Sequence, residues 1–169
     1  GVPVRCQILG FLDVQNRSAI DRKTVDAWQA EGVIEYLGAT DDVRPTIAAA
    51  DCVVLPSYRE GTPRSLLEAS AMGRPIITTD APGCRDVVDD GASGYLCALR
   101  DVASLADAMR RFAMLSPEQR ATMGAEGRRK MERQFDEQIV IKAYLDWLER
   151  HCLIEPAASA TTMMPKSTQ

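Results

Sequence analysis

The stretch that most constrains the fold connects two short apolar runs, residues 52–56 and 75–79. Each run has the length and composition of one buried strand. Between them lie a loop that contains Gly61 and Pro63 and then a helical segment. Proline fits the first turn of a helix, because its missing N–H would have no partner there. The stretch therefore predicts a strand, a loop, a helix and a second strand, which is the repeating unit of a parallel sheet.

The same alternation of strands and helices extends over most of the chain. Strands are expected at residues 4–10, 33–37, 52–56, 75–79 and 94–97. Helices are expected at 19–31 and 45–50, after Pro63, after Asp101, from Ser116, and around 139–148. Near-continuous apolar strands are typical of a sheet that is covered on both faces. The sequence thus predicts an α/β fold with a Rossmann-like parallel sheet and helices on both faces.

Composition narrows the classes of function. The chain has 169 residues, 46% of them hydrophobic, which suits one packed α/β domain. Its net charge of −4 predicts no nucleic-acid surface, and no apolar run approaches the length of a membrane span. Five cysteines without C-x-x-C spacing and a single histidine, His151, favour neither a metal site nor histidine-based catalysis. A reducing cytoplasm is the expected compartment.

Two carboxylates flank the predicted helix start at the carboxyl end of a strand. Glu60 precedes the helix, and Glu68 lies on it. Ligands of open α/β sheets bind at this edge, and a helix N-terminus there favours phosphate. Carboxylates repel phosphate, so these two are expected to accept hydrogen bonds from hydroxyl groups on either side of it. A ribose and a hexose joined through a diphosphate meet that requirement.

The surrounding residues carry a family resemblance. The two glutamates are separated by seven residues inside the block from Val54 to Ile77, which reads V-L-P-S-Y-R-E-G-T-P-R-S-L-L-E-A-S-A-M-G-R-P-I-I. Upstream Tyr36-Leu37-Gly38 and the downstream stretch 79–85 extend the similarity. The chain resembles retaining glycosyltransferases of the family-4 type, and among them the bacterial enzymes that build capsule, exopolysaccharide or O-antigen units. The resemblance implies the C-terminal, donor-binding half of a GT-B fold, with its first strand and helix missing.

The resemblance also assigns roles to residues, each beside a simpler alternative. Glu60 becomes the catalytic residue that holds the transferred sugar, and Glu68 the ribose ligand; either could instead be an ordinary surface acid. The donor sugar and diphosphate would contact Gly61, Thr62, Pro63, Arg64 and Ser65. The base would lie against Gly38, Ala39 and Thr40, a segment for which a tight turn is an equally good interpretation. Arg64 could neutralise phosphate or pair with one of the glutamates.

Further expectations concern the whole protein. Residues 1–154 are expected to form the nucleotide-sugar-binding domain of a two-domain enzyme, and 155–169 a mobile C-terminal tail. The donor would be a UDP- or GDP-sugar, with no other cofactor and no metal. The missing N-terminal domain would bind a glycan or lipid-linked acceptor, so this chain alone should be inactive. Peripheral association with the inner face of the membrane fits such an acceptor.

Two other functions remain open at this point. A nucleotide-sugar epimerase or hydrolase of related fold is the alternative enzyme, although such enzymes rely on further acids or a histidine in the pocket. The alternative without catalysis is a nucleotide-binding module used for regulation. Turnover of a nucleotide sugar by the full-length protein, with and without acceptor, separates all three.

Overall fold

The structure is a computed structural model that describes residues 3–12 and 19–151. The expected tail at 155–169 lies outside the described residues. The chain divides into two compact units, Gly1–Arg133 and Gln134–Gln169. Each unit is described by itself.

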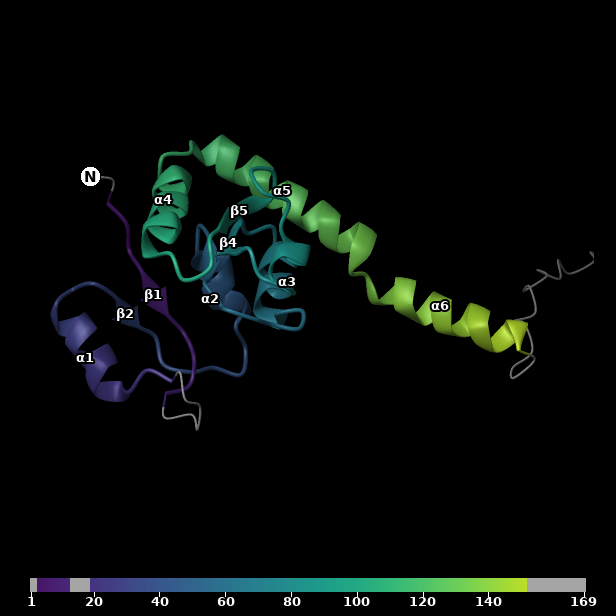
Figure 1. The fold of residues 1–169 in the computed structure, drawn as a ribbon, viewed down its shortest axis with the longest axis horizontal. Helices are drawn as coiled ribbons and strands as arrows, with labels where there is room; N and C mark the ends of the chain where they lie inside the picture. Colours follow the sequence, from purple (N-terminus) through teal and green to yellow (C-terminus); the bar gives the residue numbers. More distant parts are fainter. Residues whose placement is uncertain (1–2, 13–18, 152–169) are drawn as a thin grey trace, which may run out of the picture. The chain divides into compact units, whose positions relative to one another are not determined.

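The first unit alternates strands and helices as the sequence predicts (Figure 1). Its strands are β1 Gln7–Ile8, β2 Glu35–Tyr36, β3 Val53–Leu55, β4 Ile76–Thr79 and β5 Gly94–Cys97. Its helices are α1 Arg22–Ala30, α2 Arg44–Ala49, α3 Arg64–Ala71, the 3-10 turn η1 Arg85–Val87, α4 Val102–Ala113 and α5 Pro117–Gln134. Each expected strand and helix of this unit is present, and only η1 was not anticipated.

All strand pairs in the described residues are parallel, and they form two sheets. One sheet pairs β1 with β2, and the other has the order β3-β4-β5. In the second sheet Leu55 is opposite Thr78, and Thr78 is opposite Leu96. The carboxyl ends of β3, β4 and β5 therefore meet at one edge. All four residues of β4 are buried, so both faces of the central strand are covered. The α/β, Rossmann-like prediction is confirmed.

The core lies on the faces of this sheet. Ile77 and Tyr95 pack with Phe112 of α4 and Met123 of α5 in one apolar cluster. Helix α3 contacts β3 and β4 and contributes the fully buried Leu66. This packing fixes the start of α3 relative to the carboxyl edge of the sheet, which is where the sequence places its candidate ligand-binding residues.

Two buried threonines at the end of β4 anchor the chain that leaves β3. The Thr78 hydroxyl donates to the Leu55 carbonyl at 2.7 Å, and the Thr79 hydroxyl donates to the Ser57 carbonyl. Both threonines are at most 3% exposed. Because buried hydroxyl groups need partners, these bonds hold the loop after β3 close to the edge of the sheet.

The second unit contains one described helix, α6 Glu137–Arg150. The Asp136 side chain caps it by accepting from the Gln138 N–H at 2.8 Å. None of its residues is buried, and its exposed apolar side chains are Ile139, Val140, Ile141, Tyr144, Leu145 and Trp147. Among the described residues, no helix combines the length and the apolar character needed to cross a membrane.

Candidate active site

Glu60 sits in the loop that follows β3, and hydrogen bonds on both sides fix it. The Ser57 hydroxyl donates to Oε1 of Glu60 at 2.7 Å, while the Glu60 N–H donates to the Pro82 carbonyl at 3.4 Å. The Glu60 residue is half-buried. Within the described part of the chain, Oε2 has no hydrogen-bond partner. The site thus holds a carboxylate whose position is set and whose second oxygen can accept from a ligand.

A second loop packs directly on the first. Gly83 has φ +82, and a Cβ built on it would lie 1.6 Å from the Gly61 carbonyl oxygen and 2.6 Å from that of Glu60. Only glycine permits so close an approach and so readily adopts this backbone conformation. The Gly83 N–H in turn donates to Asp86 Oδ2 at 3.2 Å. The loop after β4 therefore forms the support on which Glu60 and Gly61 rest.

Helix α3 begins at the same place without a side-chain cap. Its N-cap is the buried Pro63, which has extended backbone (φ −68, ψ 117), and no described side chain accepts a bond there. The N–H groups of Leu66 and Leu67 donate to the Pro63 carbonyl, at 3.0 and 3.2 Å. The earlier N–H groups, on Arg64 and Ser65, point out of the helix start, as such groups do. Together with the helix dipole they favour an anion.

Glu68 lies one turn along α3 from Arg64 and forms an ion pair with it. Arg64 Nε donates to Glu68 Oε1 at 2.8 Å; the arginine side chain is 89% exposed and that of Glu68 is 33% exposed. Of the pairings that the sequence left open, the structure selects Glu68 over Glu60. An exposed ion pair of this spacing contributes about 0.5 kcal/mol or less. Arg64 can therefore turn to a phosphate at little cost and free Glu68 to accept from a hydroxyl group.

The segment Gly38–Thr40 forms a turn beyond β2. Gly38 has φ 79 and its carbonyl accepts from the Gly10 N–H at 2.9 Å, while Thr40 Oγ1 accepts from the Asp42 N–H at 3.1 Å. Among the described residues, no hydrogen bond joins this segment to the loop of Glu60 or to α3. These are the bonds of a turn, and a role in holding the base stays a prediction.

The adjacent acids Asp89 and Asp90 have partners of their own. Asp89 forms an ion pair with the buried Lys130 at 2.7 Å, and Asp90 accepts from the Leu96 N–H at 2.9 Å. In residues 3–12 and 19–151, no three acidic, cysteine or histidine side chains gather as metal ligands would. Burial raises the pKa of the Cys52 thiol to about 12, so this cysteine stays protonated. Independence from metals stays a prediction.

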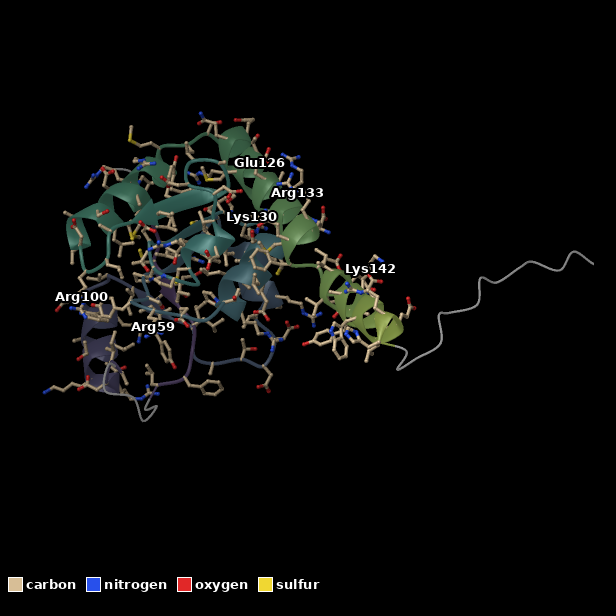
Figure 2. The ribbon with its side chains drawn as sticks, turned by 45° about the vertical axis from the view of Figure 1, so that its right-hand side comes forward. Arg59, Arg100, Glu126, Lys130, Arg133 and Lys142 are labelled. Carbon is tan, nitrogen blue, oxygen red and sulfur yellow. The ribbon has the colours of Figure 1, made fainter. Side chains whose placement is uncertain are left out.

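Three residues at the same edge were not singled out by sequence. Tyr58 and Arg59 lie in the loop of Glu60, and Arg100 follows β5. The Arg100 guanidinium stands over the Tyr58 ring at 5.1 Å. Figure 2 shows Arg59 and Arg100 on one side of the first unit, away from the labelled residues of α5. Both arginines come a few residues after a strand of the same sheet. That position in the sequence was the signal by which they could have been recognised as candidate site residues.

Comparison with known proteins identifies the family of the chain. The family described as "Glycosyl transferases group 1" matches residues 3–114. An N-acetylgalactosaminyltransferase of Campylobacter jejuni, which acts on N,N'-diacetylbacillosaminyl-diphospho-undecaprenol, is 30% identical over 120 residues, or 70% of this chain and 31% of the relative. The putative colanic acid biosynthesis glycosyltransferase WcaL of Escherichia coli is 30% identical over 148 residues, or 83% and 36%.

Solved structures share the fold. HepE of Anabaena, in complex with UDP, superposes with a TM-score of 0.75 at 20% identity and covers 87% of this chain and 41% of its own. The C-terminal domain of a group 1 glycosyltransferase from Francisella tularensis has a TM-score of 0.58 at 22% identity and covers 68% and 61%. The chain therefore belongs to the group 1 glycosyltransferase family, and its fold is that of a C-terminal GT-B domain. It spans about a third of the length of the curated relatives named above.

Proposed function

We propose that this chain is the donor-binding part of a retaining hexosyltransferase, which moves a sugar from UDP or GDP to a growing bacterial polysaccharide. The observation that carries the proposal is the placement of Glu60 and Glu68. Both are half-buried; Glu60 precedes the uncapped start of α3, and Glu68 lies on the helix one turn beyond it. An anion-favouring helix end between two hydrogen-bond acceptors matches a diphosphate between two hydroxyl-bearing rings. HepE is described in complexes with UDP and with UDP-glucose, which supports a nucleotide-sugar donor.

In this proposal the N-terminus of α3 stabilises the leaving group. The bond between the anomeric carbon and the diphosphate oxygen breaks, and the N–H groups of Arg64 and Ser65 face the negative charge that develops on that oxygen. Such preorganised donors act mainly on the transition state. Arg64 supplies a further positive charge once it leaves Glu68. The site therefore needs no cation to stabilise the diphosphate.

Glu60 and Glu68 then have different tasks. Glu68 accepts from the ribose hydroxyls, which do not change during the reaction. Glu60 accepts from hydroxyls of the transferred hexose, whose ring becomes positively charged as the bond to phosphate breaks. Retention follows when the acceptor hydroxyl attacks from the face that the diphosphate leaves, and its proton passes to the departing phosphate oxygen. The acceptor, a glycan or a lipid-linked sugar, binds to the rest of the protein, which can bring the enzyme to a membrane surface.

The test uses Glu60→Gln and Glu68→Ala in the full-length protein. Glu60→Gln keeps the shape of the side chain and removes its charge, so kcat should fall about a hundredfold or more while UDP affinity barely changes. Glu68→Ala should weaken UDP or GDP binding by about 1.5–3 kcal/mol, the range for hydrogen bonds to a charged group. Glu126→Gln is the matched control, because Glu126 is also half-buried and bound to an arginine, Arg129, but lies on α5.

Turnover of UDP- and GDP-sugars is followed with and without acceptor, and nucleotide affinity is measured by calorimetry. A Glu60→Gln enzyme with the kcat of the wild type, or with a defect in UDP binding alone, would mean that Glu60 does not face the sugar. Equal nucleotide affinity of the wild type and Glu68→Ala would remove the ribose assignment.

A further inference from the structure

The backbone of Arg100 is in a conformation that arginine rarely adopts. Its φ is +57, and it is the one non-glycine residue with a left-handed backbone among those the structure describes. For an L-residue this conformation carries a penalty that glycine avoids. Strained residues of this kind concentrate at functional sites. Glycine would adopt this backbone conformation at lower energy, so an arginine at this position points to a function of its side chain.

Hydrogen bonds hold the loop of Arg100 at both ends. The Ala98 N–H donates to the Ser104 hydroxyl at 2.9 Å, and Asp101 caps α4 by accepting from the Ser104 N–H at 2.9 Å. The Arg100 guanidinium lies over the Tyr58 ring, 5.1 Å from its centre, although Tyr58 is 60% exposed as a residue. A cation over an aromatic face is attracted to it even at an exposed position. The Tyr58 ring therefore favours this position of the guanidinium before any ligand arrives.

Arg59 follows Tyr58 in the sequence, in a loop that is anchored on both sides. Ser57 and Glu60, two residues before it and one after, are fixed by the bonds to Thr79 and Pro82 described above. Because β3 and β5 both run parallel to β4, the loops of Arg59 and Arg100 emerge at the same edge of the sheet. The Tyr58–Arg100 contact brings the two loops together, and Figure 2 shows both arginines on that side.

In the part of the chain that the structure describes, neither of these two arginines forms an ion pair. The chain carries a net charge of −4, and its described residues form eleven ion pairs. Within those residues, no carboxylate oxygen lies within 4.0 Å of a side-chain nitrogen of Arg59 or Arg100. The guanidinium group is suited to phosphate because it can donate two parallel hydrogen bonds. Two exposed guanidinium groups on neighbouring loops, one of them resting on Tyr58, form an arrangement that fits phosphate.

We propose that Arg59 and Arg100 form a phosphate clamp on the edge of the sheet that carries Glu60. The clamp binds a phosphate of a substrate of the proposed reaction, on which this inference rests. That phosphate belongs either to the donor diphosphate or to a phosphorylated acceptor. Tyr58 positions Arg100 and makes no bond to the phosphate itself.

The test measures the affinity of the full-length protein for inorganic pyrophosphate by calorimetry at low salt. Arg59→Gln/Arg100→Gln should bind it at least about tenfold more weakly than the wild type, as expected when charge-assisted hydrogen bonds are lost. Lys23→Gln/Arg111→Gln removes the same charge elsewhere and should keep wild-type affinity. Arg111 is a matched choice, since it also lies over an aromatic ring, 4.0 Å from the centre of Tyr95.

A single variant, Arg100→Gly, separates function from folding. Glycine suits φ +57 but raises the entropy of the unfolded chain and loses the Tyr58 contact, so this variant should melt close to the wild-type temperature and yet bind pyrophosphate more weakly. The clamp is refuted if the wild type binds no pyrophosphate, if the affinity of Arg59→Gln/Arg100→Gln equals that of the wild type, or if Lys23→Gln/Arg111→Gln loses as much.

Titrations with UDP and uridine distinguish the two sources of phosphate. For a donor phosphate, Arg59→Gln/Arg100→Gln weakens UDP but not uridine, and UDP displaces pyrophosphate. For an acceptor phosphate, UDP affinity is unchanged and pyrophosphate still binds to the UDP-saturated protein. If no nucleotide sugar is turned over while pyrophosphate binding still depends on both arginines, the proposed function fails and the clamp stands. If turnover occurs and neither arginine affects pyrophosphate binding, the clamp alone fails.

Discussion

Gly83→Ala should damage the site from a distance, because Gly83 supports the Glu60 loop. The added Cβ would lie 1.6 Å from the Gly61 carbonyl oxygen, whereas ordinary contact begins at 3.4 Å. The difference, 3.4 − 1.6 = 1.8 Å, is the distance by which one loop must retreat. Backbone on both sides leaves no flexible side chain to absorb the shift. The left-handed φ of +82 adds a second penalty.

The magnitude follows from those two contributions. Overpacking costs about 1–3 kcal/mol and a left-handed alanine about 1 kcal/mol, so the free energy of unfolding should fall by about 2–4 kcal/mol. The Glu60 carbonyl oxygen would also be overlapped, at 2.6 Å, so the glutamate should move with the loop. A displacement of about 1 Å at a reacting centre can lower turnover a hundredfold. We therefore expect kcat to fall by about that factor in the folded variant.

The matched control is Gly91→Ala. Gly91 has φ +77, close to that of Gly83, but a Cβ there meets no atom within 4 Å. Urea unfolding of both variants isolates the contribution of the clash, since the backbone penalty is common to them. Turnover of the full-length variants is then compared under conditions in which both are folded. Equal stability and equal kcat for Gly83→Ala and Gly91→Ala would refute the idea that Gly83 supports the Glu60 loop.

Two further predictions concern stability. The Lys130 residue is 5% exposed, whereas the Asp89 side chain is 55% exposed. Asp89→Asn would leave the buried Lys130 ammonium without its carboxylate and should lower the free energy of unfolding by about 1–3 kcal/mol. Lys130→Met leaves only a carboxylate that water can reach and should cost less than about 1 kcal/mol in the same urea titration; the reverse order would contradict the reasoning. Hydrogen bonds from the Thr24 side chain and backbone lower the pKa of Asp21, the N-cap of α1, from its ordinary 3.8. The charged Asp21 carboxylate therefore stabilises the fold above pH 3.8, and this contribution is lost as the pH falls through the lower folded-state pKa. Asp21→Asn cannot titrate. The melting temperature of Asp21→Asn should therefore fall less in acid than that of the wild type.

The sequence by itself determined the elements and their order. The apolar runs 52–56 and 75–79 predicted two strands, and the structure has β3 and β4 there; all four residues of β4 are buried, whereas β3 is partly exposed at Val54. Pro63 marked the start of α3, because proline is tolerated at the beginning of a helix and not within it. Parallel pairing followed from the helices between strands, since that connection returns the chain in the same direction. The order of the strands and helices depends on residues that are close together in the sequence, and the spacing of apolar residues along the chain encodes it.

The tertiary structure decided which side chains meet. The approach of Gly83 to Gly61 and the contact of Arg100 with Tyr58 join loops from different strands. Such contacts depend on strand order, register and loop path, which no local pattern contains.

The division of the strands into two sheets has the same origin. The expected strands at 4–10 and 33–37 shortened to the two-residue β1 and β2, which pair with each other and not with β3. Apolar character identifies a strand, but the length over which it pairs depends on where its neighbour lies. Sequence therefore named Glu60 and Glu68 as candidate site residues, whereas tertiary packing supplied the support at Gly83 and the contact of Arg100 with Tyr58.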